Sequence, residues 1–179
     1  MKSTSRNKKG QSLIEAMVAL SVLTMGFLGI LTLLSKSFFY NREVSDTMKA
    51  TYLASEGIEI AKNLVDHDTT LGLEGLGGGW GSCFATQGPL GFEADYLTQN
   101  CNALTAYNGS GNFLYYDSAT HFYGYTPFAS AVKTNFTREI MTTQNGDEII
   151  VKSIVRWNTG TITSQTIKLE AHFYNWRPH

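Results

Sequence analysis

The chain has few charged residues, few prolines and no excess of basic residues. Charged side chains make up 16% of its 179 residues, below the roughly 25% of an average soluble domain. The formal net charge is -1, whereas a nucleic-acid-binding domain usually carries a basic patch or stripe. We therefore expect no nucleic acid among its partners. The three prolines also argue against a proline-rich linker.

The sequence also lacks the patterns typical of enzymes and cofactor sites. The glycine-rich run 72–81 follows no predicted strand and does not close with Gly-Lys-Ser/Thr, so it is neither a dinucleotide fingerprint nor a phosphate loop. The two cysteines have no CxxC spacing and are too few for a zinc centre. Asp66-His67-Asp68 is better explained as an exposed helix end than as a cation site. Without a nucleophile–base pair or paired carboxylates, we expect neither an enzyme nor a cofactor or metal.

A basic N-terminus followed by a long apolar run is the most informative feature present. The basic residues before Gly10 are Lys2, Arg6, Lys8 and Lys9. No charged residue occurs from Ala16 to Leu34. As a helix, this stretch measures about 28 Å, close to the roughly 30 Å hydrocarbon core of a bilayer. The positive charge before it exceeds that of Lys36 after it, so the N-terminus should stay in the cytoplasm while the rest crosses.

Glu15 separates three explanations of this segment. A secretory signal peptide has a shorter apolar region followed by a small-residue cleavage site, and neither is found here. A plain membrane anchor explains the length but not a carboxylate, which costs about 2.5–3.5 kcal/mol at the membrane centre and less near the ends. A leader cut after Gly10 explains both features, since Glu15 then becomes the fifth residue of the mature chain.

The segment Lys8-Lys9-Gly10-Gln11-Ser12-Leu13-Ile14-Glu15, with its apolar run, resembles the N-terminus of type IV prepilins and type II secretion pseudopilins. The resemblance implies cleavage between Gly10 and Gln11 by a prepilin peptidase, followed by N-methylation of Gln11. It also implies that Glu15 accepts the ammonium group of Gln11 from a neighbouring subunit during assembly. Major pilins usually begin with Phe, so a mature chain that begins with Gln11 favours a minor subunit.

A helical period continues beyond the apolar run. The apolar positions on one face are Ala50, Leu53, Ala54, Ile58, Ala61, Leu64 and Val65. This pattern predicts one long helix from about Ser12 to about Val65, with Gly57 as its weak point. The alternative is two helices broken between Lys36 and Asn41. Gly26 and Gly29 fit either a segment that extends in a filament or close packing against a partner helix.

The C-terminal part predicts an antiparallel sheet. The expected strands are Phe136 to Thr143, Ile149 to Trp157 and Thr161 to Tyr174. Asn145-Gly146 between the first two is a strong hairpin signal. We interpret residues 66–125 as irregular, with an aromatic stretch, Phe113 to Phe128, that packs in the core or contacts other subunits rather than binding a ligand. The predicted fold class is α+β and pilin-like, with the second half of the long helix packed on the sheet.

These observations predict a domain order and a function. Residues 1–10 are the basic leader, 11–35 the hydrophobic transmembrane and assembly helix, and 36–179 the helix continuation with a globular head. If the head is exported, its compartment permits a Cys83–Cys101 disulfide, the alternative being two buried free thiols.

The expected function is a structural minor subunit of a type IV pilus or pseudopilus. Its partners would be other pilin or pseudopilin subunits, a prepilin peptidase and the membrane. It would cross the bacterial cytoplasmic (inner) membrane once and then enter the filament. The alternatives are a tip adhesin or ligand-binding pilin, and a type II secretion or competence pseudopilin.

Overall fold

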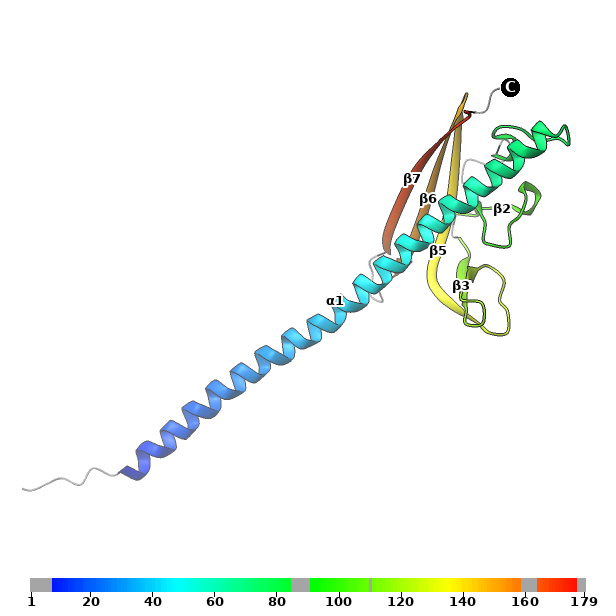
Figure 1. The fold of residues 1–179 in the computed structure, drawn as a ribbon. Helices are drawn as coiled ribbons and strands as arrows, with labels where there is room; N and C mark the ends of the chain where they lie inside the picture. The colour runs from blue at the N-terminus through cyan, green and yellow to red at the C-terminus, as the bar shows by residue number, and fades with distance from the viewer. Residues whose placement is uncertain (1–7, 85–90, 110, 159–163, 177–179) are drawn as a thin grey trace, which may run out of the picture. The chain divides into compact units, whose positions relative to one another are not determined.

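The computed structural model describes residues 8–84, 91–109, 111–158 and 164–176, with side chains from residue 12 onward. The chain divides into two compact units, Met1–Ser45 and Asp46–His179. The first unit contributes one helical segment, and the second is the head. Figure 1 shows the order of the elements along the chain.

One continuous helix, α1, runs from Lys8 to Leu73. The prediction of a single long helix is therefore confirmed, and the alternative break between Lys36 and Asn41 is wrong. The helix ends later than the predicted Val65. Thr69 and Thr70 each donate a hydroxyl hydrogen bond to the carbonyl of the preceding turn, so polar residues after Val65 still fit a helical backbone.

The C-terminal meander has the predicted order. It consists of β5 (Ala131–Asn145), β6 (Glu148–Asn158) and β7 (Ser164–Tyr174), paired antiparallel in that order. Its first strand begins five residues before the predicted Phe136, its second extends one residue beyond the prediction at each end, and the predicted start of its third, Thr161, lies outside the described residues. Asn145 pairs with Glu148, so the turn residues are Gly146 and Asp147. Gly146 has a φ of 61°, which is the conformation a tight hairpin requires at its first turn position.

The interpretation of residues 66–125 as irregular is wrong in part. This region contributes the short strands β1 (Phe92–Glu93), β2 (Thr105–Ala106), β3 (Phe113–Asp117) and β4 (Tyr123–Gly124). It also holds two 3-10 turns, η1 (Ser82–Phe84) and η2 (Cys101–Ala103). β3 and then β1 pair with the edge of β5 that β6 does not use. The long strand β5 therefore joins the meander to the middle of the chain.

The core of the head lies between α1 and one face of the sheet (Figure 1). The buried hydrophobic residues of α1 are Ala50, Leu53, Ala54, Ile60, Ala61, Leu64 and Val65. The predicted stripe is therefore correct except for Ile58, which is only partly buried, while Ile60 is buried instead. In β6, Val151, Ser153 and Val155 are fully buried and alternate with half-buried neighbours, as the period of two predicts.

The aromatic stretch is divided between the core and the surface. Tyr123 and Tyr125 pack against the core cluster around Leu114, as expected. Phe122 and Phe128 are exposed. The Tyr125 hydroxyl donates a 3.0 Å hydrogen bond to the carbonyl of Arg138, and burial raises the pKa of Tyr125.

Candidate functional site

The first part of α1 presents a largely apolar surface of exposed side chains. Every described side chain from Ser12 to Arg42 is exposed. By length and composition, this is the one described helix able to cross a membrane, and none of its most apolar window is buried. Large apolar side chains such as Leu23 and Met25 are 68% and 74% exposed. An exposed apolar surface of this extent indicates a membrane or protein environment around it.

Hydroxyl groups within this surface are satisfied by the helix itself. The Ser21 hydroxyl donates to the Met17 carbonyl over 2.6 Å, and Thr32 donates to Leu28 over 2.8 Å. Thr24 and Ser35 donate in the same way to carbonyls of the preceding turn. Such bonds remove the cost of placing a hydroxyl in hydrocarbon, where water cannot serve as partner.

Glu15 lies in this apolar part of α1 with an exposed side chain. Among the described side chains, no cation forms an ion pair with it. Gly10 and Gln11 lie in the first turns of the helix, where the structure describes the backbone only. The predicted cleavage site, N-methylation site and assembly residue thus share one helical segment, and their roles stay predictions.

Gly26 and Gly29 also lie in this segment, and apart from the adjoining turns of the helix no described atom would come within 4 Å of a Cβ at either position. Close packing inside the chain therefore does not explain these glycines. Both earlier explanations, an extensible segment and a contact with another helix, remain open to test.

In the head, Cys83 and Cys101 form the predicted disulfide, with Cα atoms 5.2 Å apart. The Asp68 carboxylate accepts hydrogen bonds from the Ser82 hydroxyl over 2.7 Å and from the Cys83 backbone N–H over 2.9 Å. The C-terminal end of the glycine-rich loop is therefore hydrogen-bonded to α1 through Asp68 and linked covalently to the η2 turn through the disulfide. Asp68 is buried and accepts the hydrogen bonds that hold this loop. The explanation of Asp66-His67-Asp68 as an exposed helix end is therefore wrong for Asp68.

A buried guanidinium, which no sequence pattern indicates, joins α1 to the sheet. Arg138 is fully buried. Its Nη1 donates to the Leu53 carbonyl over 3.0 Å and lies 3.1 Å from Glu56 Oε2. Its Nη2 donates to the Ala94 carbonyl over 2.7 Å. A buried charge is tolerated where it is paired and hydrogen-bonded, so this side chain holds three elements in one arrangement.

The outer face of the meander carries an ionisable cluster. His172 Nδ1 lies 2.7 Å from Glu148 Oε1, and the Tyr174 hydroxyl donates to the same oxygen over 2.8 Å. The hydrogen bond to Glu148 is the largest cause that raises the pKa of His172, and it likewise lowers the pKa of Glu148. Lys152 and Glu170 form a neighbouring ion pair.

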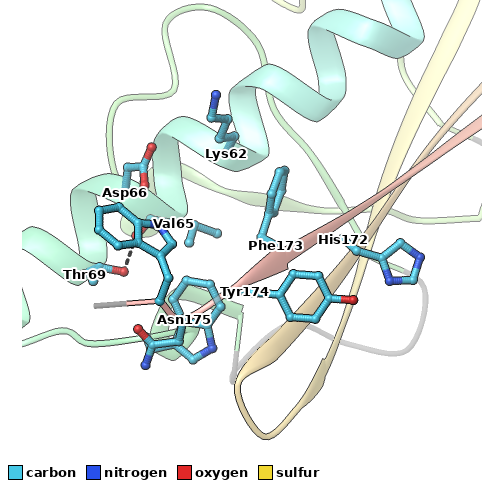
Figure 2. Close-up of a pocket in the computed structure, with 10 residues that line it drawn as sticks. Lys62, Val65, Asp66, Thr69, His172, Phe173, Tyr174 and Asn175 are labelled. Carbon is cyan, nitrogen blue, oxygen red and sulfur yellow. Dashed lines mark hydrogen bonds between the residues drawn. The ribbon is translucent and has the colours of Figure 1, made fainter. Parts of the chain in front are cut away.

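A groove of about 270 Å³ opens between α1 and the end of β7 (Figure 2). Its lining residues are Lys62, Val65, Asp66, Thr69, Trp80, His172, Phe173, Tyr174, Asn175 and Trp176. Figure 2 shows the Phe173 ring directed toward α1, while Tyr174 and His172 point away from the helix. Among the described residues, no group of His, Cys, Asp and Glu is arranged to hold a metal ion.

The comparison with known families identifies the N-terminal segment. Residues 5–31 match the prokaryotic N-terminal methylation motif, which is characteristic of type IV prepilin-like proteins. No curated protein and no solved structure gives a significant match. The predicted resemblance is thus confirmed in the segment that carries it, and the long helix followed by an antiparallel sheet is the expected pilin-like α+β architecture. The motif supports a likeness to type IV pilins and pseudopilins.

Proposed function

We propose that the chain is a minor structural subunit of a type IV pilus or pseudopilus, cleaved between Gly10 and Gln11 by a prepilin peptidase and N-methylated at Gln11. One observation carries the proposal: the methylation motif at residues 5–31 coincides with an exposed apolar helix that continues into the head. A structural role of this kind needs neither catalytic residues nor a cofactor.

We place the N-terminus on the cytoplasmic side of the bacterial inner membrane and the head on the other side. The basic residues before Gly10 support this orientation, because positive charge is retained in the cytoplasm. The Cys83–Cys101 disulfide supports it independently, since disulfides persist in oxidising compartments.

Glu15 has a specific task in this proposal. Its carboxylate lies in the exposed apolar segment and forms no ion pair with any described side chain. Moving such a segment into the apolar core of a filament makes an unpaired carboxylate costly. The free ammonium group of Gln11 in a neighbouring subunit would neutralise it. Pairing then makes incorporation depend on a correctly cleaved N-terminus.

The first experiment is intact-mass spectrometry of the protein taken from membranes of cells that contain a prepilin peptidase. We expect the mass of a chain that begins at Gln11, with or without one added methyl group and with two hydrogens lost to the disulfide. A chain that still begins at Met1 would reduce the proposal to a single-pass membrane anchor.

The second experiment separates assembly from insertion. Glu15→Val should leave membrane insertion and cleavage intact and abolish incorporation into filaments. Thr24→Val is the matched control, because it changes an exposed side chain of the same helical segment without removing a charge. Normal incorporation of Glu15→Val would contradict the pairing role.

A ligand-binding head is a second candidate function, favoured by the groove between α1 and β7. Trp176, which lines this groove, is 79% exposed, and exposed aromatic residues are enriched where proteins bind partners.

A further inference from the structure

Strand β7 is an edge strand of the described sheet. β6 is the only described strand that pairs with it. The Asn175 N–H donates to the Asp147 carbonyl over 2.8 Å. This hydrogen bond shows which residues of β7 direct their backbone N–H and C=O groups toward β6. Backbone groups of the odd-numbered residues therefore face β6, and those of the even-numbered residues face outward. Lys168, Glu170 and His172 thus present backbone N–H and C=O groups along the outer edge.

The inner face of β7 is incompletely covered. Ile149 and Val151 on the inner face of β6 are fully buried, whereas Ile167, Leu169 and Phe173 on the same face of β7 are only half-buried. These β7 side chains pack against the two core clusters from one side. A further strand with apolar side chains on this face would bury the other side.

The groove between α1 and β7 includes the C-terminal end of this edge strand. Successive residues of a strand point to opposite faces of a sheet, yet His172, Phe173 and Tyr174 all line the groove. The wall of the groove therefore includes the backbone edge of β7 as well as side chains. Val65 and Thr69 of α1 line the groove from the helix (Figure 2).

We propose that the outer edge of β7 is a docking site for an extended segment of a partner protein, which adds to the sheet as a further strand. Backbone hydrogen bonds to Lys168, Glu170 and His172 would supply affinity, and side chains facing α1 would supply specificity. The segment should carry apolar residues on its inner face, one of them seated in the groove. Its outer face should carry an acidic residue opposite Lys168 and a basic residue opposite Glu170.

A second copy of the chain fits this edge less well than a separate segment. Antiparallel pairing of β7 with β7 of another copy follows a two-fold axis, which reverses every element of the second head, including its part of α1. Two chains anchored in the same membrane through α1 run in the same direction. This choice of occupant rests on the proposed membrane anchorage, whereas the docking edge itself does not.

The test uses a synthetic peptide that alternates valine with polar residues and spans the length from Thr166 to Tyr174. Its polar positions place Glu opposite Lys168 and Lys opposite Glu170 in antiparallel register. The peptide is titrated onto the full chain in detergent micelles, and binding is followed by fluorescence anisotropy. Two matched peptides carry backbone N-methyl groups, one at the positions that face β7 and the other at the alternate positions.

We expect the unmodified peptide to bind, and N-methylation on the β7-facing edge to weaken binding by about tenfold or more, because several backbone hydrogen bonds are lost. N-methylation on the other edge should leave the affinity unchanged. Equal weakening by both peptides, or no binding of the unmodified peptide, would overturn the proposal. These outcomes are independent of cleavage at Gly10, so they are separable from failure of the filament role.

Variants of the chain give a second readout. Lys168→Pro removes an outward N–H without removing a hydrogen bond to β6, and proline is tolerated at such edge positions. Lys168→Ala is the control, since it removes the same side chain and keeps the N–H. Lys168→Pro should abolish peptide binding with an unchanged unfolding midpoint, whereas Lys168→Ala should retain most of it. Self-association that Lys168→Pro removes in sedimentation experiments would assign the edge to a second copy and overturn the proposed occupant.

Discussion

Gly57 lies where α1 packs closely against the sheet residues Ser153 and Arg138, and replacing it with alanine tests the packing of the head. A Cβ at this position would overlap the Ser153 hydroxyl and lie 3.1 Å from Arg138 Cδ. Both neighbours are fully buried. Arg138 is also held by hydrogen bonds to the Leu53 and Ala94 carbonyls, so it has little freedom to move away.

Two opposing effects decide the sign of this substitution. Alanine is favoured over glycine in a helix interior by about 1 kcal/mol. Adding a methyl group to a well-packed core costs about 1–3 kcal/mol. Because the closest neighbours of Gly57 are buried and anchored, we expect the packing cost to exceed the gain. Gly57→Ala should therefore lower the free energy of unfolding by about 1 kcal/mol.

Ser153→Ala should relieve this cost. The Ser153 hydroxyl is buried and has no hydrogen-bond partner among the described residues, so its removal alone should be neutral or slightly stabilising. In the double variant the hydroxyl that overlaps the new methyl group is absent. Gly57→Ala and Ser153→Ala should then show a favourable coupling of about 1 kcal/mol, typical of residues in direct contact.

The assay is denaturant unfolding of the full chain in detergent micelles, followed by tryptophan fluorescence. Ser55→Ala is the control, because Ser55 is exposed on the same part of α1 and reports helix propensity alone. A Gly57→Ala variant that is more stable than the wild type would refute the close approach of helix and sheet. Strict additivity with Ser153→Ala would refute the contact between the two positions.

Four further predictions concern the head. Arg138→Met should cost about 3 kcal/mol, because it leaves the carbonyls of Leu53 and Ala94 without their donor and Glu56 without its cation. Lys152→Met, in the half-exposed pair with Glu170, should cost less than about 1 kcal/mol in the same unfolding assay. Replacing Cys83 and Cys101 with serine should cost about 3 kcal/mol in the chain-entropy model, which the reductant dependence of unfolding measures. His172→Gln tests how the hydrogen bond between His172 and Glu148 contributes to the free energy of unfolding at different pH values. Since the pKa of His172 is raised above 6.5, its contribution is present at mildly acid pH and is lost as pH rises through the folded-state pKa. Since the pKa of Glu148 is lowered below 4.5, its contribution is lost as pH falls through the folded-state pKa. The stability difference between wild type and His172→Gln should therefore be largest at pH values between the folded-state pKa of Glu148 and that of His172. A difference that grows above pH 7 would contradict the pairing of His172 with Glu148.

The elements that could be predicted from the sequence are those whose signal is local and repeated. In α1 the apolar residues recur at helical spacing over many turns, and in β6 buried and half-buried residues alternate along the whole strand. Because each pattern repeats many times, it can be recognised from the sequence alone. Asn145-Gly146 likewise indicates the hairpin, although the two turn residues are Gly146 and Asp147. The choice between Ile58 and Ile60 was wrong because both flank the apolar stripe. Ile60 belongs to the cluster that includes Cys83 and Phe84, which come from a loop that helical spacing does not report.

The short strands of the middle region could not be predicted for a related reason. β1, β2 and β4 have two residues each, too few to show alternation. Their pairing depends on β5, a strand far away in the sequence. Arg138 was missed because an arginine in a strand is normally assigned to the solvent face. Its burial follows from acceptors on α1 and beside β1, which only the fold brings together.

The polar groups of α1 show why one helix can serve two environments. From Ser21 to Ser35, the hydroxyls bond to carbonyls of the same helix, so this segment needs no external polar partner. In the head, by contrast, Glu56 pairs with Arg138 and Asp68 binds the loop at Ser82. An element whose polar groups are satisfied internally can enter lipid or a filament core without leaving hydrogen bonds unmade. Glu15 is the exception among the described side chains of the apolar segment, and in the proposed filament a neighbouring chain would supply its cation.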